Sequence, residues 1–241
     1  MNLDMATLFS PAVLTNIAKA SYFIAAVLFI LGIKRMASPL KARSGIQWAG
    51  VGMVLATLAS FFYKGTDGEG LHNLPWILAA LGLGAGAAWI SGKKVAMTDM
   101  PQMVALYNGM GGGSAAAIGL VELLRMSGQG VAGASKTAVL FAVLGSLIGS
   151  ISLTGSLIAW AKLDGRMDKR YVFPGQKLFN LAVFISALVL AAMSALWLQP
   201  TVIIGFFILA LAVGLLMTLP IGGADMPVVI SLFNALTGLA V

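Results

Sequence analysis

Two asparagines, Asn108 and Asn234, are the first residues whose surroundings suggest chemistry, because each lies inside a long apolar run. A polar side chain in the middle of a membrane is costly, so it indicates a functional site by default. An amide donates and accepts hydrogen bonds, although it is not protonated near neutral pH. Together with the Ser156 hydroxyl, these amides could hold water in a proton pathway whose titratable group comes from a partner subunit.

The simplest alternative is that these side chains only join helices, since hydrogen bonds between membrane helices contribute about 0.6 kcal/mol on average. Hydroxyl side chains often bond to the backbone of their own helix. Of the four between residues 150 and 156, we therefore expect a function only for Ser156, which follows a glycine. The glycine-rich segment 109–113 favours close helix packing, or a break in the helix beside a cavity.

The two asparagines end two copies of one pattern, Asp99–Asn108 and Asp225–Asn234, and each copy begins Asp-Met-Pro. At 1.5 Å per helical residue, the step from Asp to Asn spans about 13 Å, or about half of a bilayer core. If each Asp marks a membrane surface, each Asn lies near the midplane. Asp and Pro both suit a helix start, so capping is the simplest role of the acids. Contact with a soluble domain, or a proton entrance, remains open.

The composition predicts an all-α polytopic membrane protein. The 241 residues are 59% hydrophobic and 10% charged, whereas soluble domains carry about 25% charged residues. Continuous apolar runs favour helices over a transmembrane barrel. We expect a single transmembrane domain over residues 1–241, as a bundle of about eight helices with short loops, and we interpret the apolar stop at Val241 as the end of a fragment. The expected spans are Val13–Ile33, Gly45–Tyr63, Leu74–Ile90, Pro101–Leu124, Thr137–Ala161, Leu178–Leu198, Val202–Leu219 and Met226–Val241.

The basic residues predict the orientation, because cytoplasmic loops are enriched in Lys and Arg. Most of the fifteen cations fall in the first, third and fifth loops, which places the N-terminus outside. The net charge of +7 follows from this rule and does not indicate nucleic acid. With no cysteine and one histidine, His72, a thiol or multi-histidine metal site is not expected. The cations of the three loops are Lys34, Arg35, Lys41, Arg43, Lys93, Lys94, Lys162, Arg166, Lys169, Arg170 and Lys177.

Four segments resemble the membrane domain of the beta subunit of proton-translocating NAD(P) transhydrogenase: Ala20–Ile30, Val95–Ala105, Leu153–Ser156 and Gly222–Val229. The resemblance implies hydride transfer from NADH to NADP⁺ between two soluble domains, coupled to inward proton flow through a domain of the cell inner membrane. It implies that NAD(H) and NADP(H) bind outside this segment. The implied partners are the alpha-subunit membrane helices, the NAD(H)-binding domain, an NADP(H)-binding domain of the same parent chain, and a second complex in a homodimer.

The resemblance also implies roles for individual residues. Asn108 stands where some members carry a proton-channel histidine, so a titratable group is expected from the alpha-subunit helices. Asn234 and Ser156 match polar channel positions, and Asp225 matches an acid at the cytoplasmic mouth that communicates with the NADP(H)-binding domain. Asp99 is expected to act with Asp225 in sensing that domain.

Two other functions remain as alternatives. A secondary transporter of a small solute would need a substrate site near the midplane and commonly has inverted repeats. The two Asp-Met-Pro copies are instead four spans apart, which predicts a parallel repeat. A purely structural scaffold would not explain why two asparagines lie inside apolar runs.

Overall fold

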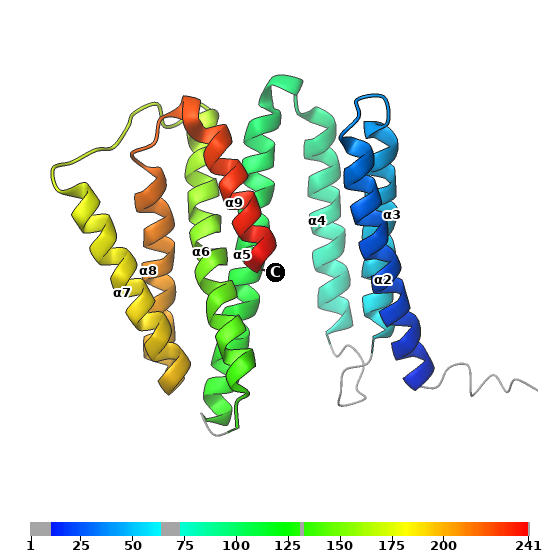
Figure 1. The fold of residues 1–241 in the computed structure, drawn as a ribbon, viewed down its shortest axis with the longest axis horizontal. Helices are drawn as coiled ribbons and strands as arrows, with labels where there is room; N and C mark the ends of the chain where they lie inside the picture. The colour runs from blue at the N-terminus through cyan, green and yellow to red at the C-terminus, as the bar shows by residue number, and fades with distance from the viewer. Residues whose placement is uncertain (1–10, 64–72, 131–132, 241) are drawn as a thin grey trace, which may run out of the picture. The chain divides into compact units, whose positions relative to one another are not determined.

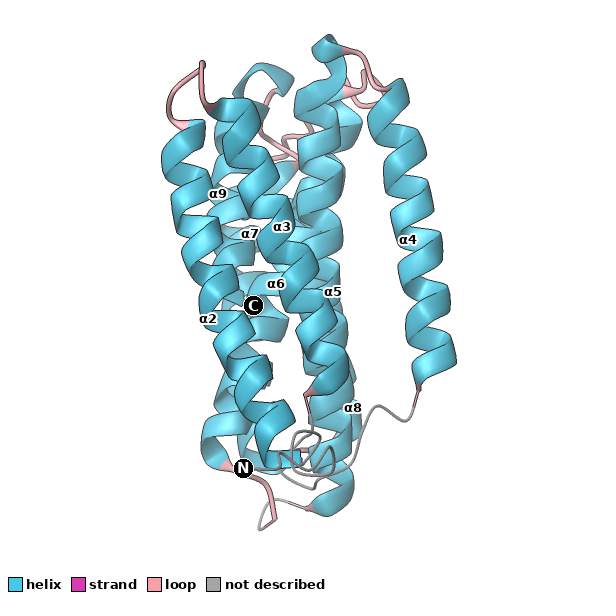
Figure 2. Ribbon diagram, turned by 90° about the vertical axis from the view of Figure 1, so that its right-hand side faces the viewer, coloured by secondary structure: helices cyan, strands magenta, loops and turns pink. Residues whose placement is uncertain are grey.

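The computed structural model describes residues 11–63, 73–130 and 133–240, so His72 and Val241 lie outside the described residues. Helices and loops make up this part of the chain, and no strand occurs in it (Figure 2). Eight described helices are long and apolar enough to cross a membrane. The predicted all-α polytopic fold is therefore confirmed.

Each spanning helix overlaps one of the predicted spans. The largest difference is in α5, which continues beyond the apolar run to Gln129, where Gly130 with φ 76° ends it. The helices are α2 (Pro11–Met36), α3 (Ala42–Phe62), α4 (Leu74–Lys94), α5 (Met100–Gln129), α6 (Lys136–Leu163), α7 (Gln176–Trp197), α8 (Pro200–Thr218) and α9 (Met226–Ala240), with short 3₁₀ helices η1 (Met97–Asp99) and η2 (Gly223–Asp225).

The chain divides into two compact units, Met1–Ile90 and Ser91–Val241, which are described separately. In the first unit, α2 and α3 pack closely because glycines face each other along their contact. A Cβ atom added to Gly45 would lie 2.6 Å from the Gly32 carbonyl oxygen, so a side chain there would separate the helices. Helix α4 has no buried residue among those the structure describes.

Helix α6 is the centre of the second unit and packs against α5, α7, α8 and α9 (Figure 1). Its contact with α5 is close, since a Cβ atom added to Gly149 would lie 2.6 Å from the carbonyl oxygen of Gly112. Helix α5 runs without interruption through the segment 109–113. The glycines therefore serve close packing and do not break the helix.

The repeated pattern is also a repeat of local structure. In each copy a 3₁₀ helix leads directly into a long α-helix, η1 into α5 and η2 into α9. The residues before the two turns, Ala96 and Gly222, have nearly identical backbone angles (φ −74°, ψ 155° and φ −76°, ψ 156°). Both helices begin at the same end of the second unit, as a parallel repeat requires (Figure 1).

Candidate functional site

A buried polar cluster lies where α5, α6 and α9 meet. The side chain of Asn108 on α5 is 7% exposed. Its Nδ2 donates to Ser156 Oγ at 2.8 Å and to Ser152 Oγ at 3.2 Å, both on α6. The structure thus brings together two of the three residues expected in a proton path, Asn108 and Ser156.

The cluster continues from α6 to α9. Ser152 Oγ lies 2.5 Å from Thr237 Oγ1 and also donates to the Phe233 carbonyl oxygen at 3.3 Å. Asn108, Ser152, Ser156 and Thr237, called the polar cluster below, therefore form one hydrogen-bonded chain across three helices. Sequence reasoning missed Ser152 and Thr237. The i,i+4 spacing of Ser152 and Ser156 places both on one face of α6 and could have indicated the first.

One acceptor of the polar cluster is unused within the described part of the chain. Asn108 Oδ1 is buried and has no hydrogen-bond partner among the described residues. Leaving a buried acceptor unpaired costs about 1–3 kcal/mol. The atom is therefore a place where a water molecule or a protonated donor would be stabilised.

Asn234 lies apart from the polar cluster, on the exposed side of α9. The buried side of that helix carries Ile230, Phe233 and Thr237 instead. The Phe233 ring packs where Gly155 of α6 leaves room, since any side chain at Gly155 would overlap the ring. The equal spacing of the two asparagines from their acids thus predicts their depth along the helix but not the side they face.

The acids that open the two copies both lie at the end of the second unit where α5 and α9 begin. The half-buried Asp99 accepts a hydrogen bond from the Thr98 hydroxyl at 3.1 Å. Asp99 is the N-cap residue of α5, so its predicted position at the helix start is confirmed, but its side chain makes no capping hydrogen bond to the first turn. Asp225 is exposed and lies 3.5 Å from a terminal nitrogen of Arg170, in the loop between α6 and α7.

Lys162 is a buried cation that the sequence presented only as one of several loop charges. Its Nζ donates to the carbonyl oxygens of Thr218, Leu219 and Ile221, at 3.2, 2.5 and 2.5 Å. These carbonyls end α8 and form the turn that leads to Asp225. A cation is favourable there, because the last carbonyls of a helix lack partners and carry partial negative charge. Lys162 thus ties the turn before the second copy to α6.

The first copy is attached to the same end of α6 by a weaker contact. Gln102 Nε2, in the first turn of α5, donates to the carbonyl oxygen of Leu163 at 3.1 Å. The end of α6 therefore contacts the beginning of the first copy directly and the turn before the second copy through Lys162.

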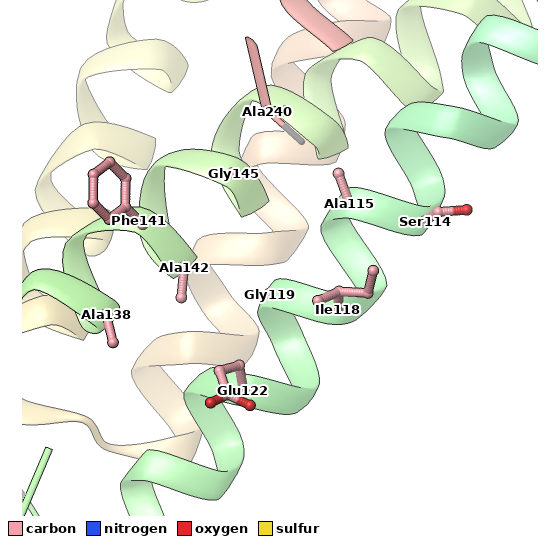
Figure 3. Close-up of a pocket in the computed structure, with 10 residues that line it drawn as sticks. All are labelled: Ser114, Ala115, Ile118, Gly119, Glu122, Ala138, Phe141, Ala142, Gly145 and Ala240. Atoms are coloured by element: carbon pink, nitrogen blue, oxygen red, sulfur yellow. The ribbon is translucent and has the colours of Figure 1, made fainter. Parts of the chain in front are cut away.

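A groove of about 310 Å³ lies between α5 and α6, and Ala240 of α9 reaches one end of it (Figure 3). Its lining is mostly small and apolar, with Glu122 as the one acid among the lining residues. Glu122 is about 21 Å farther along α5 than Asn108, at 1.5 Å per residue. None of the lining residues belongs to the polar cluster, although Ala240 at the other end of the groove is three residues beyond Thr237 on α9.

Comparison with known proteins agrees with the resemblance seen in the sequence. A protein-family model described as "NAD(P) transhydrogenase beta subunit" matches residues 18–241. Two Rhodospirillum rubrum proteins named NAD(P) transhydrogenase subunit beta are each 35% identical to this chain over 229 residues, which is 93% of this chain and 48% of the relative. The chain spans about half the length of these curated relatives. It belongs to the NAD(P) transhydrogenase beta subunit family.

Proposed function

We propose that this chain forms the proton-translocating part of the membrane domain of an NAD(P) transhydrogenase, coupling inward proton movement to hydride transfer from NADH to NADP⁺. The observation that carries the proposal is the polar cluster, which is buried in an apolar helical unit and keeps Asn108 Oδ1 without a partner. Membership of the beta subunit family supports it. A small-solute transporter is less favoured, because the repeat is parallel.

The groups of the polar cluster can relay hydrogen bonds but cannot hold a proton alone. The hydroxyls of Ser152, Ser156 and Thr237 can each donate and accept a hydrogen bond, and the Asn108 amide donates to two of them. A water molecule at Asn108 Oδ1 would extend the relay. An amide is not protonated near neutral pH, so the titratable group comes from the alpha-subunit membrane helices. Asn234, on the exposed side of α9, is available to such a helix and completes the path there.

Coupling acts through the end of the unit that carries Asp99 and Asp225. The NADP(H)-binding domain of the parent chain contacts these acids, and Lys162 connects the turn before Asp225 to α6. Because α6 also carries Ser152 and Ser156, a displacement of the turn reaches the polar cluster through one rigid helix. Coupled transport requires two states that differ in proton access, with the bound nucleotide favouring one of them.

We propose the following subunit composition and membrane location for the parent complex. The complete complex contains the alpha-subunit membrane helices and the NAD(H)-binding domain, binds NAD(H) and NADP(H) outside this segment, and forms a homodimer. It lies in the cell inner membrane, with the basic loops on the cytoplasmic side. The excess of Lys and Arg in those loops supports this orientation.

The test uses the full-length parent complex with its companion subunits in sealed vesicles, and follows pH during hydride transfer. In Asn108→Leu we expect proton movement per hydride to fall by at least about tenfold, equivalent to roughly 1.4 kcal/mol in the difference between the barriers for proton movement and for hydride transfer. Ser114→Ala is the matched control, because this exposed hydroxyl on α5 bonds only to the Met110 carbonyl of its own helix. Hydride transfer without any pH change in the parent complex would refute the proposal.

A further inference from the structure

A basic pocket lies in the first unit, at the turn that joins α2 to α3. It has a volume of about 360 Å³ and lies at one end of two helices long enough to span a membrane. Three of its six lining residues are cations. The lining residues are Leu31, Lys34, Arg35, Ser38, Lys41 and Trp48.

The first unit offers no neutralising charge for these cations in its described part. Neither residues 11–63 nor residues 73–90 contain an Asp or a Glu. A fourth cation, Arg43, lies in the same segment outside the pocket lining. The pocket is therefore positively charged, and an anion would find no carboxylate repelling it from these parts of the unit.

The Arg35 side chain is held in place for binding. Its Nε donates to Ser44 Oγ at 2.7 Å, and its guanidinium carbon lies 4.7 Å from the centre of the Trp48 ring. These contacts fix the plane of the guanidinium, while its terminal nitrogens have no acceptor among the described residues. A fixed guanidinium whose two terminal nitrogens are free matches a phosphate group, to which arginine binds through two parallel hydrogen bonds.

Orientation of the protein in the membrane accounts for loop cations in general but not for this arrangement. An excess of exposed Lys and Arg is enough to set sidedness, and Lys34 and Lys41 are exposed. Arg35 is half-buried and is held by two specific side chains, which sidedness does not require. The side chain of Lys41, the N-cap residue of α3, makes no capping hydrogen bond, so the first amide groups of that helix receive no acceptor from it.

We propose that this pocket binds the phosphate group of an anionic membrane phospholipid. Basic pockets beside transmembrane helices are suited to lipid headgroups. Leu31 gives the pocket an apolar wall, and Leu40 in the same turn is 97% exposed, so acyl chains find apolar surface next to the cations. Inorganic phosphate shares the headgroup chemistry but gains nothing from this apolar surface.

The test measures phospholipid binding to the purified full-length complex in nanodiscs. The discs contain phosphatidylcholine alone or phosphatidylcholine mixed with phosphatidylglycerol, and native mass spectrometry counts the lipids retained on the protein. The salt concentration is kept high, because the Debye length falls to about 3 Å at 1 M and diffuse attraction is then screened. The variants Arg35→Gln and Lys41→Gln each remove one pocket cation, and Arg43→Gln removes a cation of the same segment that does not line the pocket.

We expect the parent complex to retain phosphatidylglycerol, with about fivefold weaker retention for each pocket cation removed and no change in Arg43→Gln. An equal loss in Arg43→Gln would overturn the proposal, since only surface potential would then be at work. Equal retention of phosphatidylcholine would also overturn it. Inorganic phosphate is titrated in both kinds of disc, and tight binding that is undiminished in the discs with phosphatidylglycerol would refute a lipid ligand. None of these measurements involves hydride transfer, so their outcome is independent of the proposed function.

Discussion

The two copies of the Asp-Met-Pro pattern begin alike and then face their surroundings differently. In the first copy the buried positions include Ala105, Asn108 and Gly112. In the second they include Ile230, Phe233 and Thr237, each one residue before the equivalent position. One residue corresponds to about 100° of rotation around a helix with 3.6 residues per turn. The repeat therefore conserves how the helix begins and how deep each residue lies, but not which side is buried.

The surface of α6 accounts for this rotation. Gly112 lies against Gly149 so closely that a Cβ atom on it would be 2.9 Å from that carbonyl oxygen. The second copy meets α6 at Gly155, where the large Phe233 ring occupies the free space. Where α6 carries a glycine, the facing helix either approaches closely with a second glycine, as at Gly112, or fills the space with a large ring, as at Phe233. The orientation of each copy follows from what it packs against, and not from its own sequence pattern.

The largest effect is expected when a side chain is added at Gly112 of the first copy, compared with the same change at the equivalent glycine of the second copy. In Gly112→Leu the new Cβ atom meets the backbone of α6, and we expect a loss of at least about 3 kcal/mol in the free energy of unfolding, the upper range for overpacking. Gly238, thirteen residues after Asp225 as Gly112 is after Asp99, has no atom within 4 Å of an added Cβ atom. Gly238→Leu is therefore the matched control. Thermal unfolding of the purified complex measures both, and equal destabilisation would refute the rotation.

The second effect concerns the asparagines themselves. Asn108→Leu removes the donor to Ser152 and Ser156 and leaves buried hydroxyls less well paired, for which we expect a loss of about 2 kcal/mol. Asn234 is exposed within this chain, so Asn234→Leu should change the free energy of unfolding by no more than about 0.5 kcal/mol. The difference in the free energy of unfolding between the two variants shows which asparagine is packed inside the protein. Proton movement per hydride tests the role in the proton path that is proposed for both. A stability loss in Asn234→Leu as large as in Asn108→Leu would show that both are buried.

The sequence could predict much of the fold and only part of the site, for separable reasons. Long apolar runs require helices in a membrane, because every backbone polar group must be paired, so the spans could be located. The repeat and the helical rise placed Asn108 near the midplane, and the glycine before Ser156 singled out that hydroxyl among its neighbours; the structure brings the two side chains together. Thr237 and Lys162 could not be found in this way. Their roles depend on partners in α6 and α8 that are distant in sequence, and helix rotation decides which side chains meet.

A third effect concerns the anchoring of the second copy. Lys162→Met keeps the length of the side chain but removes the ammonium donor from three carbonyl oxygens of the 218–221 turn. Two of them keep a backbone donor, Ile221 N–H for Thr218 and Tyr171 N–H for Leu219. We expect a loss of about 1 kcal/mol, since the lost hydrogen bonds cost more than this while removal of a buried charge offsets part of it. Lys169→Met, which changes an exposed lysine, is the control. Proton movement per hydride should fall in Lys162→Met if the turn transmits coupling, and an unchanged ratio would argue against that route.

The smallest effect is expected at Arg170, the cation that lies beside the acid of the second copy. Arg170 lies 3.5 Å from Asp225, and both side chains are more than 60% exposed, whereas Asp99 receives only the Thr98 hydroxyl among its described neighbours. Exposed ion pairs contribute about 0–1 kcal/mol and are screened by salt. For Arg170→Gln we therefore expect less than about 0.5 kcal/mol of destabilisation at low salt and none at high salt, from thermal unfolding of the complex at both ionic strengths. The guanidinium also packs against Gly222, so a larger loss that persisted at high salt would show that this packing, and not the charge pair, holds the turn before the second copy.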